Sequence, residues 1–177
     1  MKRIILLTFI ITGFISVISA QDNTRSQNPV VLLNPATGYI TINEFTGGFG
    51  LGVTNAPYAK GFFGFTTLHG YQLNKSFLVA GGTGVYFYNT GTLVPLFLDL
   101  RYRVYIARFT PYVFGDGGIL LDFSGKKDTR AFVNPGIGCS YTINPKLAVN
   151  LGTGFFVQWG NVRDSYINLK AGVVYKF

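Results

Sequence analysis

The last eleven residues of the chain alternate between two kinds of side chain with a period of two. Apolar residues at Ile167, Leu169, Ala171, Val173, Tyr175 and Phe177 are separated by residues that are mostly small or polar. Such alternation is typical of a β-strand with only one face in an apolar environment. No segment after the first 20 residues shows convincing helical periodicity, so the sequence favours an all-β fold.

The same pattern recurs along the chain, interrupted by residues that favour turns. Groups rich in Gly, Asn, Asp or Pro, such as Asn89-Thr90-Gly91 and Asn144-Pro145-Lys146, recur about every 16 to 19 residues. They divide the chain into eight predicted strands at 39–53, 60–71, 77–88, 93–105, 110–123, 131–143, 147–159 and 165–177.

The N-terminus has the features of an export signal. Lys2 and Arg3 precede an apolar run from Ile4 to Ile18, which is short for a membrane-spanning helix, and Ser19-Ala20 offers a cleavage site. We predict that residues 1–20 are a secretory signal peptide; an uncleaved N-terminal anchor is the alternative. Removing 20 of the 177 residues leaves 157, which is enough for one domain.

The composition excludes several classes of protein. Only 12% of the residues are charged, whereas about 25% is usual in soluble domains. The basic residues are scattered without a run, so a nucleic-acid-binding surface is not expected. Cys139 is the only cysteine, which excludes an intramolecular disulfide and a cysteine-based metal site, and no cofactor is predicted.

Charged residues in two neighbouring predicted strands keep to one face of each strand. Segment 93–105 has charges only at odd positions and segment 110–123 only at even positions, namely Asp99, Arg101, Arg103, Asp116 and Asp122. In segment 93–105 the opposite face carries Leu96, Leu98 and Leu100. Each strand therefore has one apolar face without ionised side chains.

The composition of the polar face indicates which side of the sheet meets water. In a soluble barrel that face would be dense in Lys, Glu and Asp, but here it is mostly Gly, Thr and Asn. Small residues suit the interior of a narrow closed sheet. Strands can cross hydrocarbon only as a closed barrel, so we predict an eight-stranded antiparallel up-and-down transmembrane β-barrel at 39–177. Aromatic residues would form belts near its ends, at Tyr71, Tyr102, Tyr141, Tyr175, Phe177, Phe87 and Trp159.

With its export signal, eight amphipathic strands and terminal Tyr175-Lys176-Phe177, the chain resembles the small outer-membrane β-barrel superfamily of Gram-negative bacteria, which includes the OmpA transmembrane domain, OmpX-like and opacity-type proteins. The resemblance implies an outer-membrane location and an assembly signal at Tyr175 and Phe177, read by the barrel-assembly machinery. It also implies periplasmic termini, so that 21–38 is a periplasmic-side segment. The external loops would be 54–59, 89–92, 124–130 and 160–164.

A group of charged residues is expected inside the barrel. Residues whose numbers sum to about 215 face each other across the turn near Ala107-Arg108, which brings Asp99, Arg101, Arg103 and Asp116 together. Glu44 and Lys170, on the first and last strands, would complete the luminal ion network. Two interpretations remain open: the network plugs and rigidifies the barrel, or it forms a gated polar path or small-ligand site.

Three other features of the sequence are candidates for chemistry. His69 is the only histidine, but it is predicted on the outer face near the periplasmic rim, without an obvious Ser or carboxylate partner. The glycines of 47–52 lack the Lys-Ser/Thr of a phosphate loop and are better explained by crowding inside the barrel. Cys139 is expected on the lipid face as a small apolar filler.

The expected function is a non-enzymatic outer-membrane barrel with a side-chain-filled lumen, which serves envelope structure or contact with lipids or external ligands. Lys126, Lys127 and Arg130 cluster in one predicted external loop, where they form either a solvated turn or a contact with lipopolysaccharide phosphates. The expected partners are outer-membrane lipids, including lipopolysaccharide. Two alternatives stay open: a lipid-modifying enzyme acting on lipid A acyl chains, and a secreted lipocalin-like binder.

Overall fold

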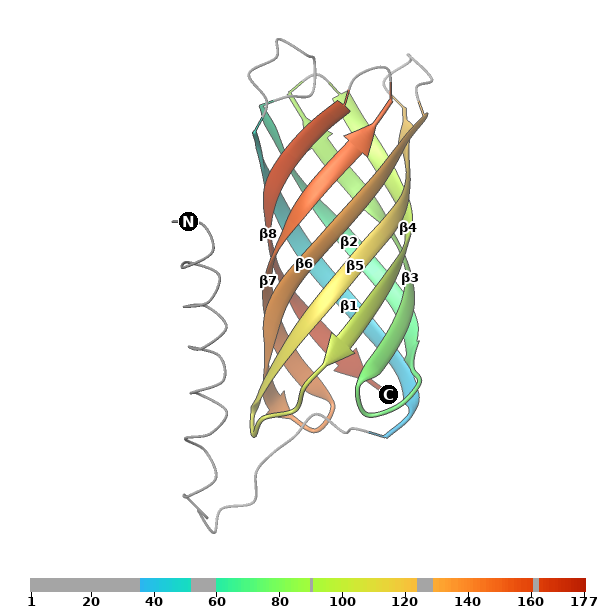
Figure 1. The fold of residues 1–177 in the computed structure, drawn as a ribbon. Coiled ribbons are helices and arrows are strands. Elements are labelled where there is room, and N and C mark those ends of the chain that lie inside the picture. Colours follow the sequence, from blue (N-terminus) through green and yellow to red (C-terminus); the bar gives the residue numbers. More distant parts are fainter. Residues whose placement is uncertain (1–35, 52–59, 90, 124–128, 161–162) are drawn as a thin grey trace, which may run out of the picture.

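The computed structural model describes residues 36–51, 60–89, 91–123, 129–160 and 163–177, which form a closed antiparallel barrel (Figure 1). The strands are β1 (Gly38–Gly50), β2 (Gly61–Gln72), β3 (Phe77–Tyr88), β4 (Gly91–Arg103), β5 (Phe109–Asp122), β6 (Thr129–Asn144), β7 (Leu147–Trp159) and β8 (Arg163–Lys176). Each strand pairs with the next one in the sequence, and β8 returns to β1. Within these residues, no helix is long and apolar enough to cross a membrane.

The predicted fold class is confirmed, and the strand boundaries differ from the predicted ones by at most three residues. β3 and β7 begin and end where the sequence predicted. β1 was expected to continue to residue 53, but it ends at Gly50, and residues 52–59 lie outside the described part. The predicted signal peptide (1–20) and most of the predicted segment 21–38 also lie outside it.

Closure depends on the pairing of β1 with β8. Their register runs from Ile40 opposite Lys176 to Gly50 opposite Tyr166. In hydrocarbon, each backbone N–H or C=O group without a hydrogen-bond partner costs on the order of several kcal/mol. The closed sheet satisfies this requirement because every strand has two neighbours.

The two ends of the barrel differ in their connections. At one end, called here the C-terminal end, lie the start of β1, Phe177 and the tight turns after β2, β4 and β6 (Figure 1). In the β4–β5 turn, Ile106 and Phe109 exchange backbone hydrogen bonds of 2.9 and 3.0 Å, and Ala107 has a φ of 54°. The predicted turn at Ala107-Arg108 is therefore confirmed. β1, β3, β5 and β7 end at the opposite end, called here the far end.

Large apolar side chains cover the outside of the barrel, and the ionised side chains at mid-barrel level lie inside. Leu98 and Leu151 are 63% and 67% exposed, whereas Glu44 and Asp99 are 0% exposed. The outward phase predicted for Leu96, Leu98, Leu100 and Tyr102 is confirmed by their exposure. Val157 is an exception: the alternation along β7 places it on the outer face, but its side chain is only 4% exposed. This arrangement is the reverse of a soluble barrel and suits hydrocarbon.

Replacing Leu98 by Arg should destabilise the barrel by about 2 to 4 kcal/mol in lipid vesicles, because the charge would lie near the middle of the apolar band. Phe123→Arg is the matched control. Phe123 is 71% exposed and follows β5 at the far end, so its cost should be about 0 to 1 kcal/mol. Urea unfolding in vesicles measures both values. Equal costs at the two positions would contradict the assigned membrane band.

Candidate functional site: the barrel lumen

The inner wall pairs glycines with aromatic rings on neighbouring strands. Gly48 lies opposite Phe62, Gly64 opposite Tyr86, Gly82 opposite Phe97, Gly136 opposite Phe114 and Gly138 opposite Tyr112. A Cβ atom at any of these glycines would collide with the ring across from it. The glycines thus make room for aromatic side chains, and substitution at these positions would displace rings from the lumen.

Phe62, Tyr86 and Phe97 belong to a layer of rings that fills the half of the lumen toward the far end, whereas Tyr112 and Phe114 lie beside Arg101. The rings of Phe62 and Phe156 have centroids 5.3 Å apart, and Phe132 stacks on Phe156 at 4.9 Å. The layer is completed by Tyr86, Tyr88, Phe97 and Tyr166, all buried. The sequence predicted small residues on the inner face but did not predict this aromatic layer. The alternation of inward glycines with inward aromatics was the signal that could have revealed it.

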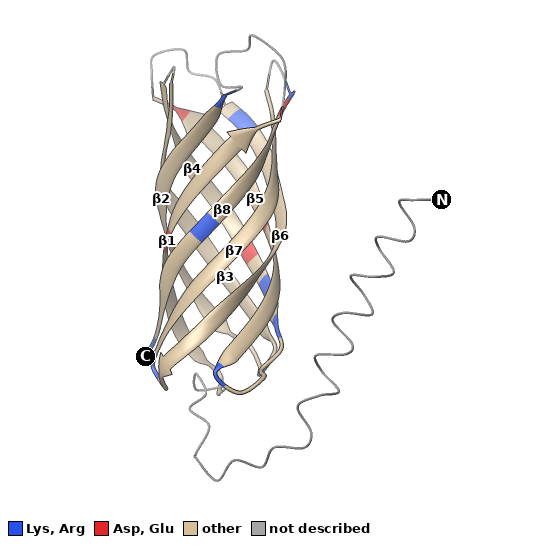
Figure 2. Cartoon of the chain, turned by 90° about the vertical axis from the view of Figure 1, so that its left-hand side faces the viewer, with Lys and Arg blue, Asp and Glu red and all other residues tan. Residues whose placement is uncertain are grey.

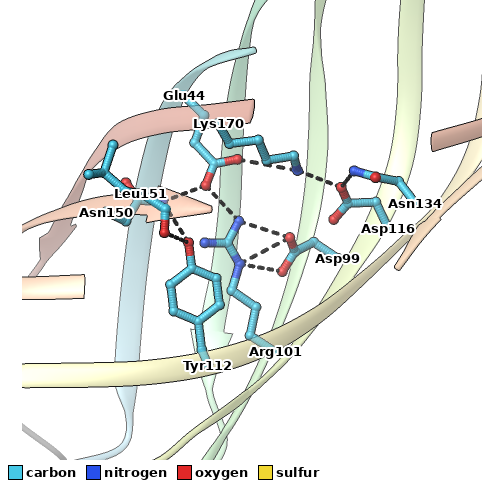
Figure 3. Close-up of polar contacts among 9 residues, drawn as sticks. All are labelled: Glu44, Asp99, Arg101, Tyr112, Asp116, Asn134, Asn150, Leu151 and Lys170. Carbon is cyan, nitrogen blue, oxygen red and sulfur yellow. Dashed lines mark hydrogen bonds and ion pairs between the residues drawn. The ribbon is translucent and has the colours of Figure 1, made fainter. Parts of the chain in front are cut away.

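An ion network lies next to the aromatic layer and is centred on Arg101 of β4 (Figure 3). Its Nη2 donates to Glu44 Oε1 at 2.9 Å and to Asp99 Oδ2 at 2.9 Å, and its Nε donates to Asp99 Oδ1 at 2.9 Å. The guanidinium carbon also lies 5.2 Å from the centre of the Tyr112 ring, which is a cation–π distance. One guanidinium therefore links β4 to β1 across the lumen.

Lys170 of β8 forms the second cationic centre. Its Nζ lies 2.5 Å from Asp116 Oδ2 and 3.5 Å from Glu44 Oε2, and 4.6 Å from the centre of the Phe114 ring. Asn134 Nδ2 donates to the same Asp116 oxygen at 2.8 Å. Glu44 is shared by both cations and ties the two halves of the network together.

Amide and hydroxyl groups extend the network to the remaining wall. Asn150 Nδ2 donates to Glu44 Oε1 at 2.6 Å and lies 3.4 Å from the Tyr112 hydroxyl, which donates to the Leu151 carbonyl at 3.4 Å (Figure 3). The network thus connects residues from β1, β4, β5, β6, β7 and β8.

The charges in this network are almost completely removed from solvent. Glu44, Asp99, Arg101, Asp116 and Lys170 are between 0% and 5% exposed. A buried charge that loses its partner costs about 3 to 5 kcal/mol, because water cannot replace the missing contact. Asp99 and Asp116 lie directly opposite each other in the β4–β5 pairing, as the predicted register sum of 215 requires. Like charges directly opposite each other are unfavourable, and here each carboxylate is paired with a cation, Asp99 with Arg101 and Asp116 with Lys170.

Arg103 was predicted to belong to this network, but it lies one step closer to the C-terminal end. It is 3% exposed and contacts the Tyr105 side chain. Nearby, Gln72 accepts a 3.0 Å hydrogen bond from Lys176 Nζ and donates to the Tyr105 hydroxyl at 3.1 Å. Lys176 Nζ also donates to the Ala36 carbonyl. These residues form a second polar layer, which the sequence did not predict.

A third polar group lies inside the far end and includes Arg130. The sequence placed Arg130 in an external loop, but it belongs to β6, is 7% exposed and pairs with Asp164 at 3.5 Å. Gln158 Nε2 donates to Asp164 Oδ2 and to the Tyr166 hydroxyl, each at 3.1 Å. β6 and β8 extend further than predicted, which turns both Arg130 and Asp164 inward. Lys126 and Lys127 lie outside the described residues.

His69 and Cys139 lie on the outer face. The Tyr39 hydroxyl is 2.7 Å from His69 Nδ1, and the Thr41 and Thr67 hydroxyls are each 3.4 Å from a ring nitrogen. Cys139 is partly buried and lines an apolar surface groove of about 660 Å³, together with Leu151 and Leu169. Among the described residues, no three His, Cys, Asp or Glu side chains are grouped to hold a metal ion.

Aromatic residues surround the C-terminal end on the outside. Tyr175 and Phe177 have ring centroids 4.8 Å apart, and Phe177 lies 5.2 Å from the Tyr39 ring. All seven residues predicted for the two aromatic belts are exposed, from 37% at Tyr141 to 67% at Phe177. The role of Tyr175 and Phe177 as an assembly signal stays a prediction.

No family model and no curated protein matches this sequence. Among solved structures, Neisserial surface protein A is similar with a TM-score of 0.59 and 17% identity, over 80% of this chain and 99% of that protein. The chain has the fold of the small eight-stranded outer-membrane β-barrels.

Two further structures align with this outer-membrane barrel fold. The N-terminal β-barrel domain of Pseudomonas aeruginosa OprF has a TM-score of 0.49 and 15% identity, over 79% of this chain and 100% of that one. A designed transmembrane β-barrel has a TM-score of 0.47 and 14% identity, over 79% and 96%.

Arg101→Met should destabilise the barrel by about 3 to 5 kcal/mol, because Glu44 and Asp99 would remain buried without their main cation. The triple variant Glu44→Gln/Asp99→Asn/Arg101→Met removes the stranded charges as well, and it should recover at least about 1 kcal/mol of that loss. Urea unfolding in vesicles gives both values. A triple variant less stable than the single one would contradict the ion network described here.

Proposed function

We propose that this protein is a non-enzymatic outer-membrane barrel that strengthens the cell envelope and contacts its lipids. The filled lumen carries the proposal. The aromatic layer, the ion network and the polar layer near Lys176 occupy successive levels of the interior, as the buried positions of Phe156, Arg101 and Gln72 illustrate. An eight-stranded barrel is wide enough only for side chains, so such an interior supports a structural role better than transport.

The outer surface supports a membrane location for this role. The exposed apolar side chains extend over all eight strands, including Phe45, Phe63, Leu98, Leu151 and Leu169. Aromatic residues lie toward both ends of this band, where the headgroup regions of a bilayer would be. The fold shared with Neisserial surface protein A agrees with an outer-membrane location after export.

The environment of His69 supports a non-enzymatic role over lipid A chemistry. The groups that contact its ring are the hydroxyls of Tyr39, Thr41 and Thr67. A histidine acting as a general base for acyl transfer is usually oriented by a carboxylate and paired with a nucleophile. The hydrogen bonds around His69 instead fix the ring among the aromatic residues of the C-terminal end.

Deleting the gene from the native host should increase the sensitivity of the cells to detergents and large antibiotics, while the masses of their lipid A species stay unchanged. Complementation with the wild-type gene and with His69→Ala should restore resistance equally, because the histidine has no catalytic task. Antibiotic sensitivity and lipid A mass spectrometry are the measurements. An altered lipid A profile that His69→Ala fails to correct would support the enzyme instead.

A further inference from the structure

The charged side chains at the C-terminal end are all cationic in the described part of the chain. This end carries Lys75, Arg103, Arg108, Lys146 and Lys176, and the acidic residues of the described chain lie at the central network or the far end. Figure 2 shows this distribution, with blue segments at the lower end and red segments only above them. The far end, in contrast, mixes Lys60, Arg130 and Arg163 with Asp122 and Asp164.

Three of the five cations are exposed and available to a ligand. Arg103 and Lys176 are buried in the lumen at 3% and 1% exposure. Lys75, Arg108 and Lys146 are exposed, and each belongs to a different turn, after β2, β4 and β6 respectively. They are therefore distributed around the end of the barrel, and we refer to these three residues as the cationic ring.

Short, hydrogen-bonded turns hold the cationic ring close to the strands. Asn74 Oδ1 accepts hydrogen bonds from the backbone N–H groups of Ser76 and Phe77, both at 2.8 Å, which folds the turn that carries Lys75. Asn144 Oδ1 accepts a 2.9 Å hydrogen bond from the Lys146 N–H. Arg108 lies within the two-residue turn between Ile106 and Phe109. None of these turns reaches far beyond the sheet.

Exposed aromatic residues place this ring at the depth of lipid headgroups. Phe109, directly after Arg108, packs against Tyr141 with ring centroids 5.1 Å apart. Phe77, two residues after Lys75, packs against Tyr102 at 5.0 Å. Aromatic belts lie at the boundary between hydrocarbon and headgroups, so cations one or two residues further out meet the headgroup phosphates.

We propose that the cationic ring of Lys75, Arg108 and Lys146 binds anionic phospholipid headgroups in the leaflet at the C-terminal end. The three side chains are complementary to anionic headgroups, because no Asp or Glu of the described residues lies in the turns that carry them. Their spacing, one in each turn, suits separate lipid molecules around a rim better than one acidic protein held at a single patch. The inference rests on the membrane-spanning role proposed above.

Fluorescence quenching by brominated lipids tests this proposal with the full chain in vesicles. The reporter is Phe109→Trp in a Trp159→Phe background, which leaves one tryptophan beside Arg108. Vesicles contain phosphatidylcholine and phosphatidylglycerol, with one or the other brominated. We expect phosphatidylglycerol to be preferred about two- to fivefold at the reporter, and 0.5 M salt to reduce the preference.

Two sets of additional substitutions assign the preference to the ring. Lys75→Gln/Arg108→Gln/Lys146→Gln should bring the ratio to about 1, whereas the control Lys60→Gln/Arg163→Gln at the far end should leave it unchanged. Heat-modifiable gel mobility verifies that each variant is folded. A parent protein without preference, or a triple variant that keeps it, would overturn the proposal.

The same experiment separates this proposal from its alternatives. A second assay measures retention of the folded barrel on immobilised polyglutamate. If the protein shows no lipid preference but is retained there, and the triple variant is not retained, the ligand is an acidic polymer and the lipid assignment is overturned. Failure to insert into vesicles of either composition would overturn the membrane-spanning role itself. Insertion without lipid preference overturns only the present inference.

Discussion

The pairing of β1 with β8 is the contact on which the rest of this structure depends. It removes the two open edges that an eight-stranded sheet would otherwise present, and hydrocarbon offers no water to satisfy such edges. The same two strands carry Glu44 and Lys170, which pair inside the barrel. Closure of the backbone and neutralisation of the buried charges are therefore linked, because the ion network forms only when β8 reaches β1.

The narrow circumference then decides what the lumen can contain. Several large rings lie opposite a glycine on the neighbouring strand, as with Gly48 beside Phe62 and Gly82 beside Phe97. In the central network, cations and carboxylates meet in pairs, as at Arg101 and Lys170. The glycine–ring pairs contribute to the aromatic layer, and the pairs of opposite charge form the ion network. They leave the outer surface as the part of the molecule that can contact partners.

Much of the fold could be predicted because an alternation of period two fixes both the strands and their faces. The tight turn at Ala107-Arg108 fixes the register of β4 and β5, so the approach of Asp99 to Asp116 followed from residue numbers alone. The register of a hairpin gives no such information about strands on opposite walls. The contacts of Arg101 with Glu44 across the lumen depend on the size of the barrel and on side-chain conformation, and these required the structure.

The errors have a common physical origin at strand ends. Arg130 was expected in the external loop 124–130, because the next strand was predicted to begin at 131, but two more residues of pairing bring it into β6 and against Asp164. Arg103 points inward like Arg101, but it lies one step further along β4, where its side-chain hydrogen bond is with Tyr105. Whether a residue is at an odd or even position in a strand predicts which face its side chain occupies. Its level along the barrel axis depends on how far the strand pairing extends.

Spin labels along β4 distinguish apolar side chains that face lipid from side chains that face the barrel axis. In a Cys139→Ser background, single cysteines at positions 95 to 100 are labelled in vesicles, and their accessibility to oxygen and to a water-soluble nickel complex is measured. High oxygen accessibility is expected at 96, 98 and 100, and low accessibility at 95, 97 and 99. The opposite alternation, with oxygen reaching the odd positions, would contradict this arrangement.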